Sequence, residues 1–228
     1  MTENLSTYPA HLDARLDQPL SRWLWLVKWL LVIPHAVVLI FLWLATFVLT
    51  IVAGFAILFT GRYPRSLFDF NVGVMRWTWR VSYYGLSGFG TDKYPPFSLK
   101  SDPDYPADFT VEYPQQLSRG LVLVKWWLLA LPQLLVVAII SGGSHSIGGF
   151  GLITALVLIA GFFLLFTKRY PQPLFDFVMG LNRWCYRVLA YVALMRDEYP
   201  PFRLDAGGTD PGSARPVPAP APEPHPVG

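Results

Sequence analysis

Charged side chains are scarce in this sequence. Only 14% of its 228 residues are Asp, Glu, Lys or Arg, whereas 53% are hydrophobic and 16% are aromatic. A soluble domain usually has about a quarter of its residues charged, so the composition predicts an integral membrane protein. The net charge of +3 comes from basic residues beside apolar runs. This pattern favours an anionic membrane surface over nucleic acid as the partner.

The residue types that build catalytic sites are also few. A single cysteine, Cys185, excludes an intrachain disulfide framework and a cysteine-rich metal site. We interpret it as a small packing residue, with reversible palmitoylation as the alternative. No Gly-rich phosphate loop follows a strand, and no carboxylate lies inside an apolar segment. We therefore expect no enzyme, no cofactor and no proton-coupled transport. The histidines lack metal-ligand spacing: His11, His35, His145 and His225.

A cleavable signal peptide is not indicated. Residues 1–22 are polar, and no small-residue cleavage pattern follows a short apolar core. We expect residues 1–22 to form a cytoplasmic segment and the first apolar stretch to remain as an anchor.

The sequence does contain an internal duplication. Lys28-Trp recurs 97 positions later at Lys125, and the Arg-Tyr-Pro motif at Arg62 recurs 107 positions later at Arg169. The second copy therefore holds ten extra residues (107 − 97), for which the polar stretch 141–149 is the candidate insertion. The predicted units are 23–98 and 119–204, joined by a cytoplasmic linker, 99–118.

Apolar stretches near 20 residues long can cross a hydrocarbon core of about 30 Å. The insertion separates two such stretches, 121–140 and 150–167. In the first unit, residues 23–60 leave two alternatives: a hairpin with a tight turn near 42–46, or one span that begins at Pro34. None of the 18 Lys and Arg residues falls at a hairpin tip. The positive-inside rule therefore favours two parallel hairpins, four transmembrane helices and cytoplasmic termini.

Each hairpin is followed by Arg-Tyr-Pro and a stretch of mixed apolar and basic character, at 66–85 and 173–192. Proline ends the preceding helix, and arginines four residues apart share one helical face. We interpret both stretches as amphipathic helices in the cytoplasmic interface. The alternative is that they pack on the spans as ordinary helices. The candidate contacts for anionic lipid or a partner are Lys28, Lys125, Arg62, Arg76, Arg80, Arg169, Arg183 and Arg187.

Two aspartates, Asp69 and Asp176, fall in the first turns of these helices, where a carboxylate meets the positive end of the helix dipole. We predict that both form structural ion pairs with nearby arginines.

Three ionisable residues lie within the apolar stretches: Lys28, Lys125 and His35. Lys28 and Lys125 occupy matched positions close to one end, so their stems can reach the cytoplasmic surface. The functional alternative is a pair of cations for an anionic lipid or substrate. His35 follows Pro34, and Gln133 follows a matched proline. We interpret both as polar repair of a proline kink rather than as a proton relay.

Short strands and an extended tail complete the prediction. Apolar and polar residues alternate at 12–17 and 108–113, which predicts short strands in a small cytoplasmic sheet. Residues 205–228 are rich in Pro and Gly, so we expect a disordered tail.

The order of these motifs resembles the bacterial membrane family DUF4389, a domain of unknown function, present as two tandem copies over about residues 8–204. The motifs that carry the resemblance are Arg62–Phe70, Arg76–Val81 and Tyr94–Phe97, and again Arg169–Phe177, Arg183–Val188 and Tyr199–Phe202. The resemblance implies a multi-pass protein of the bacterial plasma membrane. It supplies no activity and no catalytic residues.

The functional expectation is a non-enzymatic scaffold or accessory subunit that contacts anionic lipid and a protein partner or a second copy of itself. The alternative is a component of a lipid or small-solute transporter or channel, because duplicated membrane units often form a site at their interface.

Overall fold

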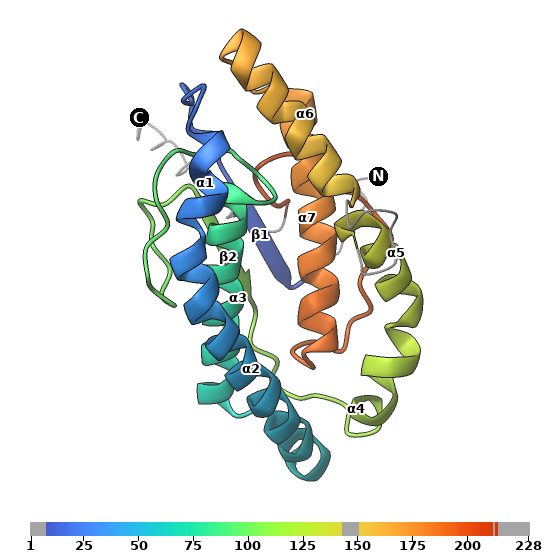
Figure 1. Cartoon of the computed structure of the whole chain (residues 1–228). Helices are drawn as coiled ribbons and strands as arrows, with labels where there is room; N and C mark the ends of the chain where they lie inside the picture. Colours follow the sequence, from blue (N-terminus) through green and yellow to red (C-terminus); the bar gives the residue numbers. More distant parts are fainter. Residues whose placement is uncertain (1–7, 143–150, 212, 214–228) are drawn as a thin grey trace, which may run out of the picture.

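The computed structural model describes residues 8–142, 151–211 and 213, which fold into helices and one small sheet (Figure 1). The predicted insertion, from residue 143, and the tail, from residue 214, lie outside the described residues. The elements are β1 (Ala10–Ala14), α1 (Trp25–Leu31), α2 (Ile33–Thr60), α3 (Arg65–Gly85), β2 (Ala107–Val111), α4 (Leu121–Val124), the π-helical turn η1 (Lys125–Leu129), α5 (Leu131–Ser141), α6 (Leu152–Thr167) and α7 (Gln172–Val192).

Helix α2 corrects the hairpin prediction for residues 23–60. It runs for 28 residues through the stretch 42–46, where a tight turn was expected. The continuous helix agrees with the alternative of one span that begins at Pro34, in which α2 is a candidate span. Proline is tolerated in a first helical turn because its missing N–H has no intrahelical acceptor there. Gly61 ends the helix with φ = 71°, a left-handed conformation that favours glycine.

The described residues contain fewer candidate spans than the four predicted. By length and composition, α2 could cross a membrane, and only 17% of its most apolar window is buried. The pair of segments Leu121–Leu129 and Leu131–Ser141 passes the same test only if the two count as one helix, because they are bent by 43°. Helix α6 is apolar but shorter. The structure therefore shows one or two candidate spans.

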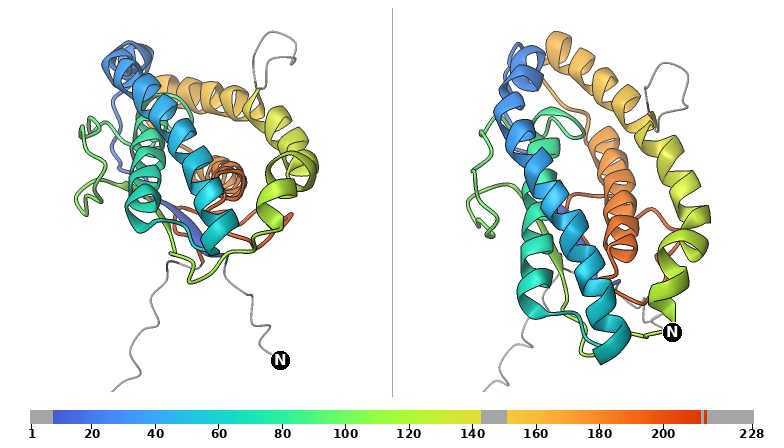
Figure 2. Two further views of the ribbon diagram at one scale, coloured as in Figure 1. Left: turned by 90° about the horizontal axis from the view of Figure 1, so that it is seen from below. Right: turned by 60° about the horizontal axis from the view of Figure 1, so that its bottom comes forward.

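Helices α3 and α7 begin one residue before the predicted stretches 66–85 and 173–192 and end with them. They occupy the middle of the molecule, with α2, α5 and α6 on one side and the sheet on the other (Figure 2). Most residues of both helices are partly or fully buried. The alternative that these helices pack as internal helices agrees with this placement.

The predicted strands are present as an antiparallel pair, each starting one or two residues earlier than expected. β1 and β2 pair with Leu12 opposite Phe109. β1 precedes the first unit and β2 precedes the second, and we count each strand with the unit that it precedes. Each strand packs on the helix of the other unit, because β2 lies on α3 and β1 lies on α7. The strands therefore bind the two units to one another.

Contacts between the units occur in matched pairs. Leu12 pairs with Phe109, its own counterpart 97 positions later. The rings of Trp79 and Tyr186, counterparts 107 positions apart, have centroids 5.5 Å apart. These contacts describe an approximate two-fold axis that runs from the sheet through the layer of α3 and α7.

The helices obey the same relation. From Trp79 to Tyr83 along α3, the ring partner moves backward along α7, from Tyr186 to Phe175. Helices α3 and α7 are therefore antiparallel, as are the strands.

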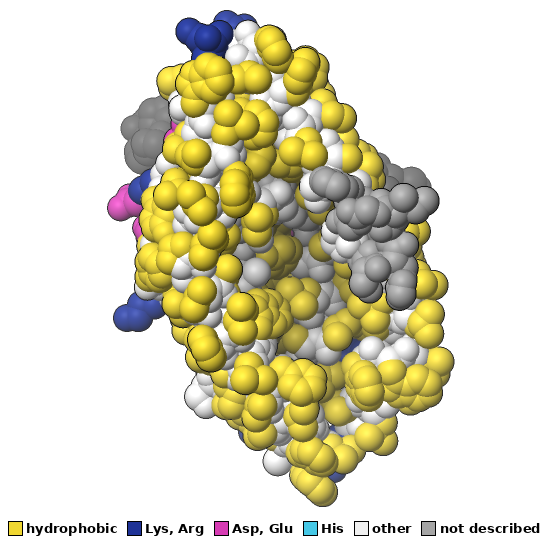
Figure 3. All heavy atoms as spheres, viewed as in Figure 1, with side chains coloured by type: hydrophobic (Ala, Val, Ile, Leu, Met, Phe, Trp, Pro, Cys, Tyr) yellow, Lys and Arg dark blue, Asp and Glu magenta, His cyan; other side chains and the backbone are white. Residues whose placement is uncertain are grey.

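The face viewed in Figure 3 is almost entirely hydrophobic, with basic and acidic side chains at its edges. Large exposed apolar side chains are concentrated on α1, α2, η1, α5 and α6. We call these five elements the apolar layer. Thirty large apolar side chains on these five elements are exposed.

Candidate functional site

Helix α7 contributes two buried arginines that are held by carboxylates and by the sheet. Arg183 and Arg187 are 0% and 2% exposed. Arg183 Nε lies 2.9 Å from Asp210 Oδ2, and Arg187 Nη2 lies 3.1 Å from the same oxygen. Arg187 Nη1 also lies 2.6 Å from Asp205 Oδ2. Arg183 Nη2 donates to the carbonyl of Leu12 on β1 at 2.9 Å.

Helix α3 repeats this arrangement at its matched positions. Arg76 Nε lies 2.9 Å from Asp108 Oδ1, and Arg80 Nη2 lies 3.4 Å from the same oxygen. Arg76 Nε also donates to the carbonyl of Phe109 on β2 at 2.9 Å. Because Phe109 is the counterpart of Leu12, each unit's arginine binds the strand of the other unit.

These four arginines form what we call the arginine layer. Burying an unpaired cation costs several kcal/mol, so each guanidinium depends on its carboxylate and carbonyl partners. Arg80, Arg183 and Arg187 have almost no exposed surface, and Arg76 is mostly enclosed. The predicted lipid contact is therefore not made by these side chains, which serve inside the protein.

The matched lysines are also internal. Lys28 Nζ lies 2.8 Å from Asp92 Oδ1, and Lys125 Nζ lies 2.9 Å from Asp197 Oδ1. Both lysines are at most 1% exposed, so neither reaches the surface as expected. Instead they hold the segments that follow α3 and α7 against the last turn of α1 and the start of η1.

The aspartate partners also cap the chain. Asp92 Oδ2 accepts the backbone N–H of Ser21 at 2.5 Å, and Asp197 Oδ2 accepts that of Ser118 at 2.6 Å. Sequence analysis missed both aspartates. The available signal was that each lies two residues before a Tyr-Pro-Pro-Phe motif.

His35 and Gln133 bind matched tryptophans. Trp77 Nε1–H donates to His35 Nδ1 at 3.1 Å, and Trp184 Nε1–H donates to Gln133 Oε1 at 2.7 Å. Both side chains therefore bind an indole, on α3 and α7 respectively. This corrects the prediction that they repair a proline kink.

The remaining predicted residues lie near the surface. Arg62 and Arg169 are exposed. Asp69 makes the predicted ion pair, with Arg65 Nε 3.0 Å from its Oδ2. Within the described part of the chain, Asp176 accepts a hydrogen bond from Gln172 at 2.8 Å rather than forming an ion pair.

The start of the predicted tail belongs to the fold. Asp205 and Asp210 lie within residues 205–228, yet both pair with the arginine layer. Asp210 is only 2% exposed, because two guanidinium groups enclose its carboxylate. The predicted disorder is therefore wrong for residues 205–211.

Two apolar grooves open between the units. The smaller, about 350 Å³, lies between α1 and α6 and includes Trp25, Trp29 and Leu158. The larger, about 670 Å³, lies between α2 and the α4–η1 segment. It includes Val122, Trp126 and Ile51, which occupy the positions in the other unit that match Trp25, Trp29 and Leu158. The larger one accounts for the hollow beside α2 in Figure 3. We call them the α1–α6 groove and the α2–α4 groove.

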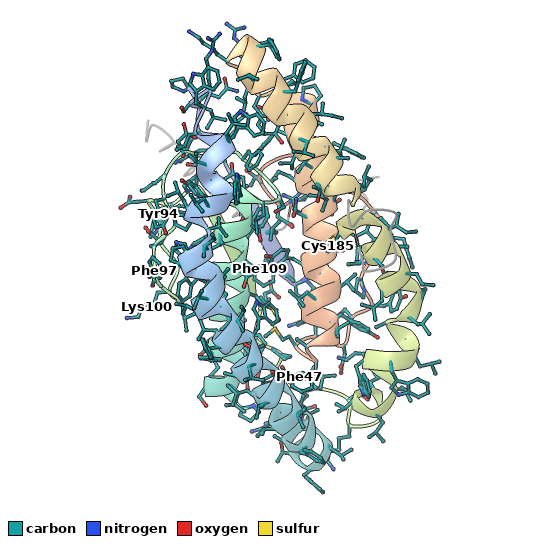
Figure 4. The ribbon with its side chains drawn as sticks, viewed as in Figure 1. Phe47, Tyr94, Phe97, Lys100, Phe109 and Cys185 are labelled. Carbon is teal, nitrogen blue, oxygen red and sulfur yellow. The ribbon has the colours of Figure 1, made fainter. Side chains whose placement is uncertain are left out.

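Possible metal ligands do not cluster in the described part of the chain. Over residues 8–142 and 151–211, no three His, Cys, Asp or Glu side chains come together as a metal site would require. Cys185 lies on α7 and packs against the hydrophobic core (Figure 4). Burial raises the pKa of its thiol to about 12, so it stays a thiol at neutral pH.

Exposed apolar helices around a core of internal ion pairs define a mostly helical protein with one or two candidate membrane spans. The chain belongs to the family described as domain of unknown function DUF4389, whose model matches residues 22–98 and 119–203. No curated protein and no solved structure matches the chain.

The arginine layer makes a stability prediction. Replacing Asp210→Asn removes the charge that two buried guanidinium groups share, so we expect the free energy of unfolding to fall by about 3 kcal/mol. Denaturation of the detergent-solubilised protein measures this change. Asp69→Asn is the matched control, because its ion pair is solvent-exposed, and we expect a loss below about 1 kcal/mol. Equal losses for the two variants would contradict a special role for the buried pair.

His11 makes a pH prediction. Its Nδ1 lies 3.5 Å from Asp210 Oδ1 and its Nε2 lies 3.7 Å from Glu112 Oε1. The hydrogen bond to Asp210 is the main cause that raises the pKa of His11 in the folded protein. The stabilisation is therefore fully present below the unfolded pKa, about 6.5, and is lost as pH rises through the folded pKa. We expect His11→Gln to destabilise the protein more at mildly acidic than at alkaline pH in denaturation measurements. A pH-independent difference would contradict this role.

Proposed function

We propose that this protein is a non-enzymatic membrane module, a scaffold or accessory subunit, at the cytoplasmic face of a bacterial plasma membrane. One observation supports the proposal above the others. The apolar layer exposes large side chains outward, while the arginine layer directs its charges inward to carboxylates. Such a distribution reverses that of a soluble protein and suits a hydrocarbon environment.

One edge of the molecule, beside α3, suits a protein partner in the cytoplasm. The segment between α3 and β2 carries exposed polar residues, including Lys93, Lys100 and Asp104. Lys100 points away from the body of the protein (Figure 4). A membrane module with this polar side can hold a partner near the bilayer. This proposal holds whether the apolar helices cross the membrane or lie within one leaflet.

Membrane fractionation tests the proposal. We expect the protein to stay in the membrane pellet after an alkaline wash and to be purified in mild detergent with a protein partner or as an oligomer. The double variant Phe41→Glu, Phe55→Glu places two charges on the exposed face of α2, where each costs about 2.5–3.5 kcal/mol in hydrocarbon. This variant should move into the wash, whereas the control Lys100→Glu should not.

Recovery of the wild-type protein in the soluble fraction would contradict the membrane assignment. Repeated purification of the chain alone, as a monomer, would contradict the scaffold role.

The two grooves favour lipid binding, with a role in lipid transport, as the second candidate function. Both are lined almost entirely by apolar side chains, and both open within the apolar layer, where lipid chains would surround them. Leu58 lines the α2–α4 groove, whereas its neighbour Phe59 is 74% exposed.

We expect Leu58→Trp to reduce the binding of a fluorescent phospholipid several-fold, because the larger side chain occupies the groove. Phe59→Trp is the control that adds an indole outside the groove. Equal lipid binding by the two variants would remove the support for this candidate.

A further inference from the structure

The two-fold relation between the units fixes the direction of the long helices. A two-fold rotation reverses every direction perpendicular to its axis and leaves directions along the axis unchanged. Since α3 and α7 are counterparts and are antiparallel, both lie across the axis. Helix α2 is antiparallel to α3, because His35 contacts Trp77 while Thr50, further along α2, contacts Asn71. It therefore lies across the axis as well, as Figure 2 (right) illustrates.

The matched basic residues determine how this axis meets the membrane. Arg62 and Arg169 are exposed counterparts at the ends of α2 and α6. The positive-inside rule places both on the cytoplasmic side. If α2 crossed the bilayer, the axis would lie in the membrane plane and the two arginines would be on opposite sides. If the axis stands along the membrane normal, both arginines share one side and α2 lies parallel to the surface.

The charged groups lead to the same orientation. Trp43, near the middle of α2, donates to Thr78 Oγ1 on α3 at 3.0 Å. Arg76, which also lies on α3, forms an ion pair with Asp108 of β2, and the side chain of Asp108 is 26% exposed. The charged sheet thus lies beside the middle of α2 rather than beyond one of its ends. A crossing α2 would hold a partly exposed carboxylate near the centre of the bilayer, at a cost of several kcal/mol.

The apolar layer has the features of a surface that enters one leaflet. It forms one broad face, with charges confined to its edges (Figure 3). Four exposed tryptophans, a residue type enriched where hydrocarbon meets water, flank its lysine-bearing segments: Trp23, Trp29, Trp126 and Trp127. Helix α2 would be about 42 Å long, which exceeds the roughly 30 Å hydrocarbon core but suits a helix lying flat.

We propose that the protein is monotopic: the apolar layer enters the cytoplasmic leaflet, the helices α2, α3 and α7 lie near the membrane plane, and the sheet faces the cytoplasm. The occupant of the apolar face is thus the hydrocarbon of one phospholipid leaflet. This inference rests on the proposed membrane function, but it differs from the four-span arrangement that charge alone favours.

Cysteine labelling in bacterial cells tests the orientation. In a Cys185→Ser background, single cysteines replace Ser21 and Arg62 at the two ends of the α1–α2 segment, Leu44 near the middle of α2, and Lys100 on the sheet side. A membrane-impermeant maleimide is applied to intact cells and to inverted membrane vesicles, and a permeant maleimide gives the total. Thr60→Cys is a second variant for the end of α2.

The expected result is that no position reacts in intact cells. In inverted vesicles, positions 21, 62 and 100 should react and position 44 should stay protected in hydrocarbon. Labelling of positions 21 and 62 from opposite sides would overturn the inference in favour of a crossing helix. Labelling of position 44 from outside would overturn it in favour of a hairpin. Loss of the wild-type protein from the membrane fraction would instead overturn the proposed function.

Discussion

The structure depends on the pairing of four buried guanidinium groups with carboxylates from outside their helices. Helices α3 and α7 carry arginines at matched positions, and each pair meets an aspartate at the sheet or in the segment after α7. Because an uncompensated buried cation is costly, these helices cannot pack without that aspartate. The pairing also crosses between units, since Arg76 binds β2 and Arg183 binds β1. One constraint therefore accounts for the sheet, for the order of the segment after α7 and for the joining of the two units.

The same pairing decides which surfaces remain outside. With their basic faces turned to the sheet, α3 and α7 pack their apolar sides against helices of the apolar layer. Those helices in turn bury few of their own side chains, as α2 shows. The lysine–aspartate pairs at Lys28 and Lys125 tie α1 and η1 of the apolar layer to the segments that follow α3 and α7. A charged core joined to an exposed apolar layer suits surroundings in which water does not contact that layer, and this supports the proposed membrane location.

Local signals predicted the elements well. The Arg-Tyr-Pro motifs located the starts of α3 and α7, because proline interrupts the preceding helix whatever the surroundings. Alternation located the starts of the two strands to within two residues. The hairpin in residues 23–60 was predicted wrongly, because a stretch without charges fits a hairpin tip and a helix lying flat in a leaflet equally well. Only the unbroken backbone of α2 distinguishes them.

The partners of the cations were harder to predict than the cations themselves. Arg183 and Arg187 occupy the positions that match Arg76 and Arg80, so the duplication reveals them. Their carboxylate partner, Asp210, lies in a Pro- and Gly-rich stretch whose composition indicates disorder. Composition reports the average tendency of a segment and does not register one aspartate that two guanidinium groups hold in place. Asp108 lies in the alternating stretch 108–113, which predicts a strand but does not indicate which cation its carboxylate meets. Long-range ion pairs leave no periodic trace in a sequence, so the basic helices were assigned to lipid.

The central claim is that the long helices lie near the membrane plane, and a measurement of their orientation in a bilayer tests it most directly. Polarised infrared spectroscopy of the wild-type protein in oriented bilayers reports whether the amide I transition moments, which follow the helix axes, lie along the membrane normal or in its plane. In the monotopic arrangement the arginine layer keeps the helices near the membrane plane, so we expect the dichroic ratio of helices that lie in that plane. A ratio for helices along the normal would contradict it, because the charged sheet would then lie at the depth of the lipid chains.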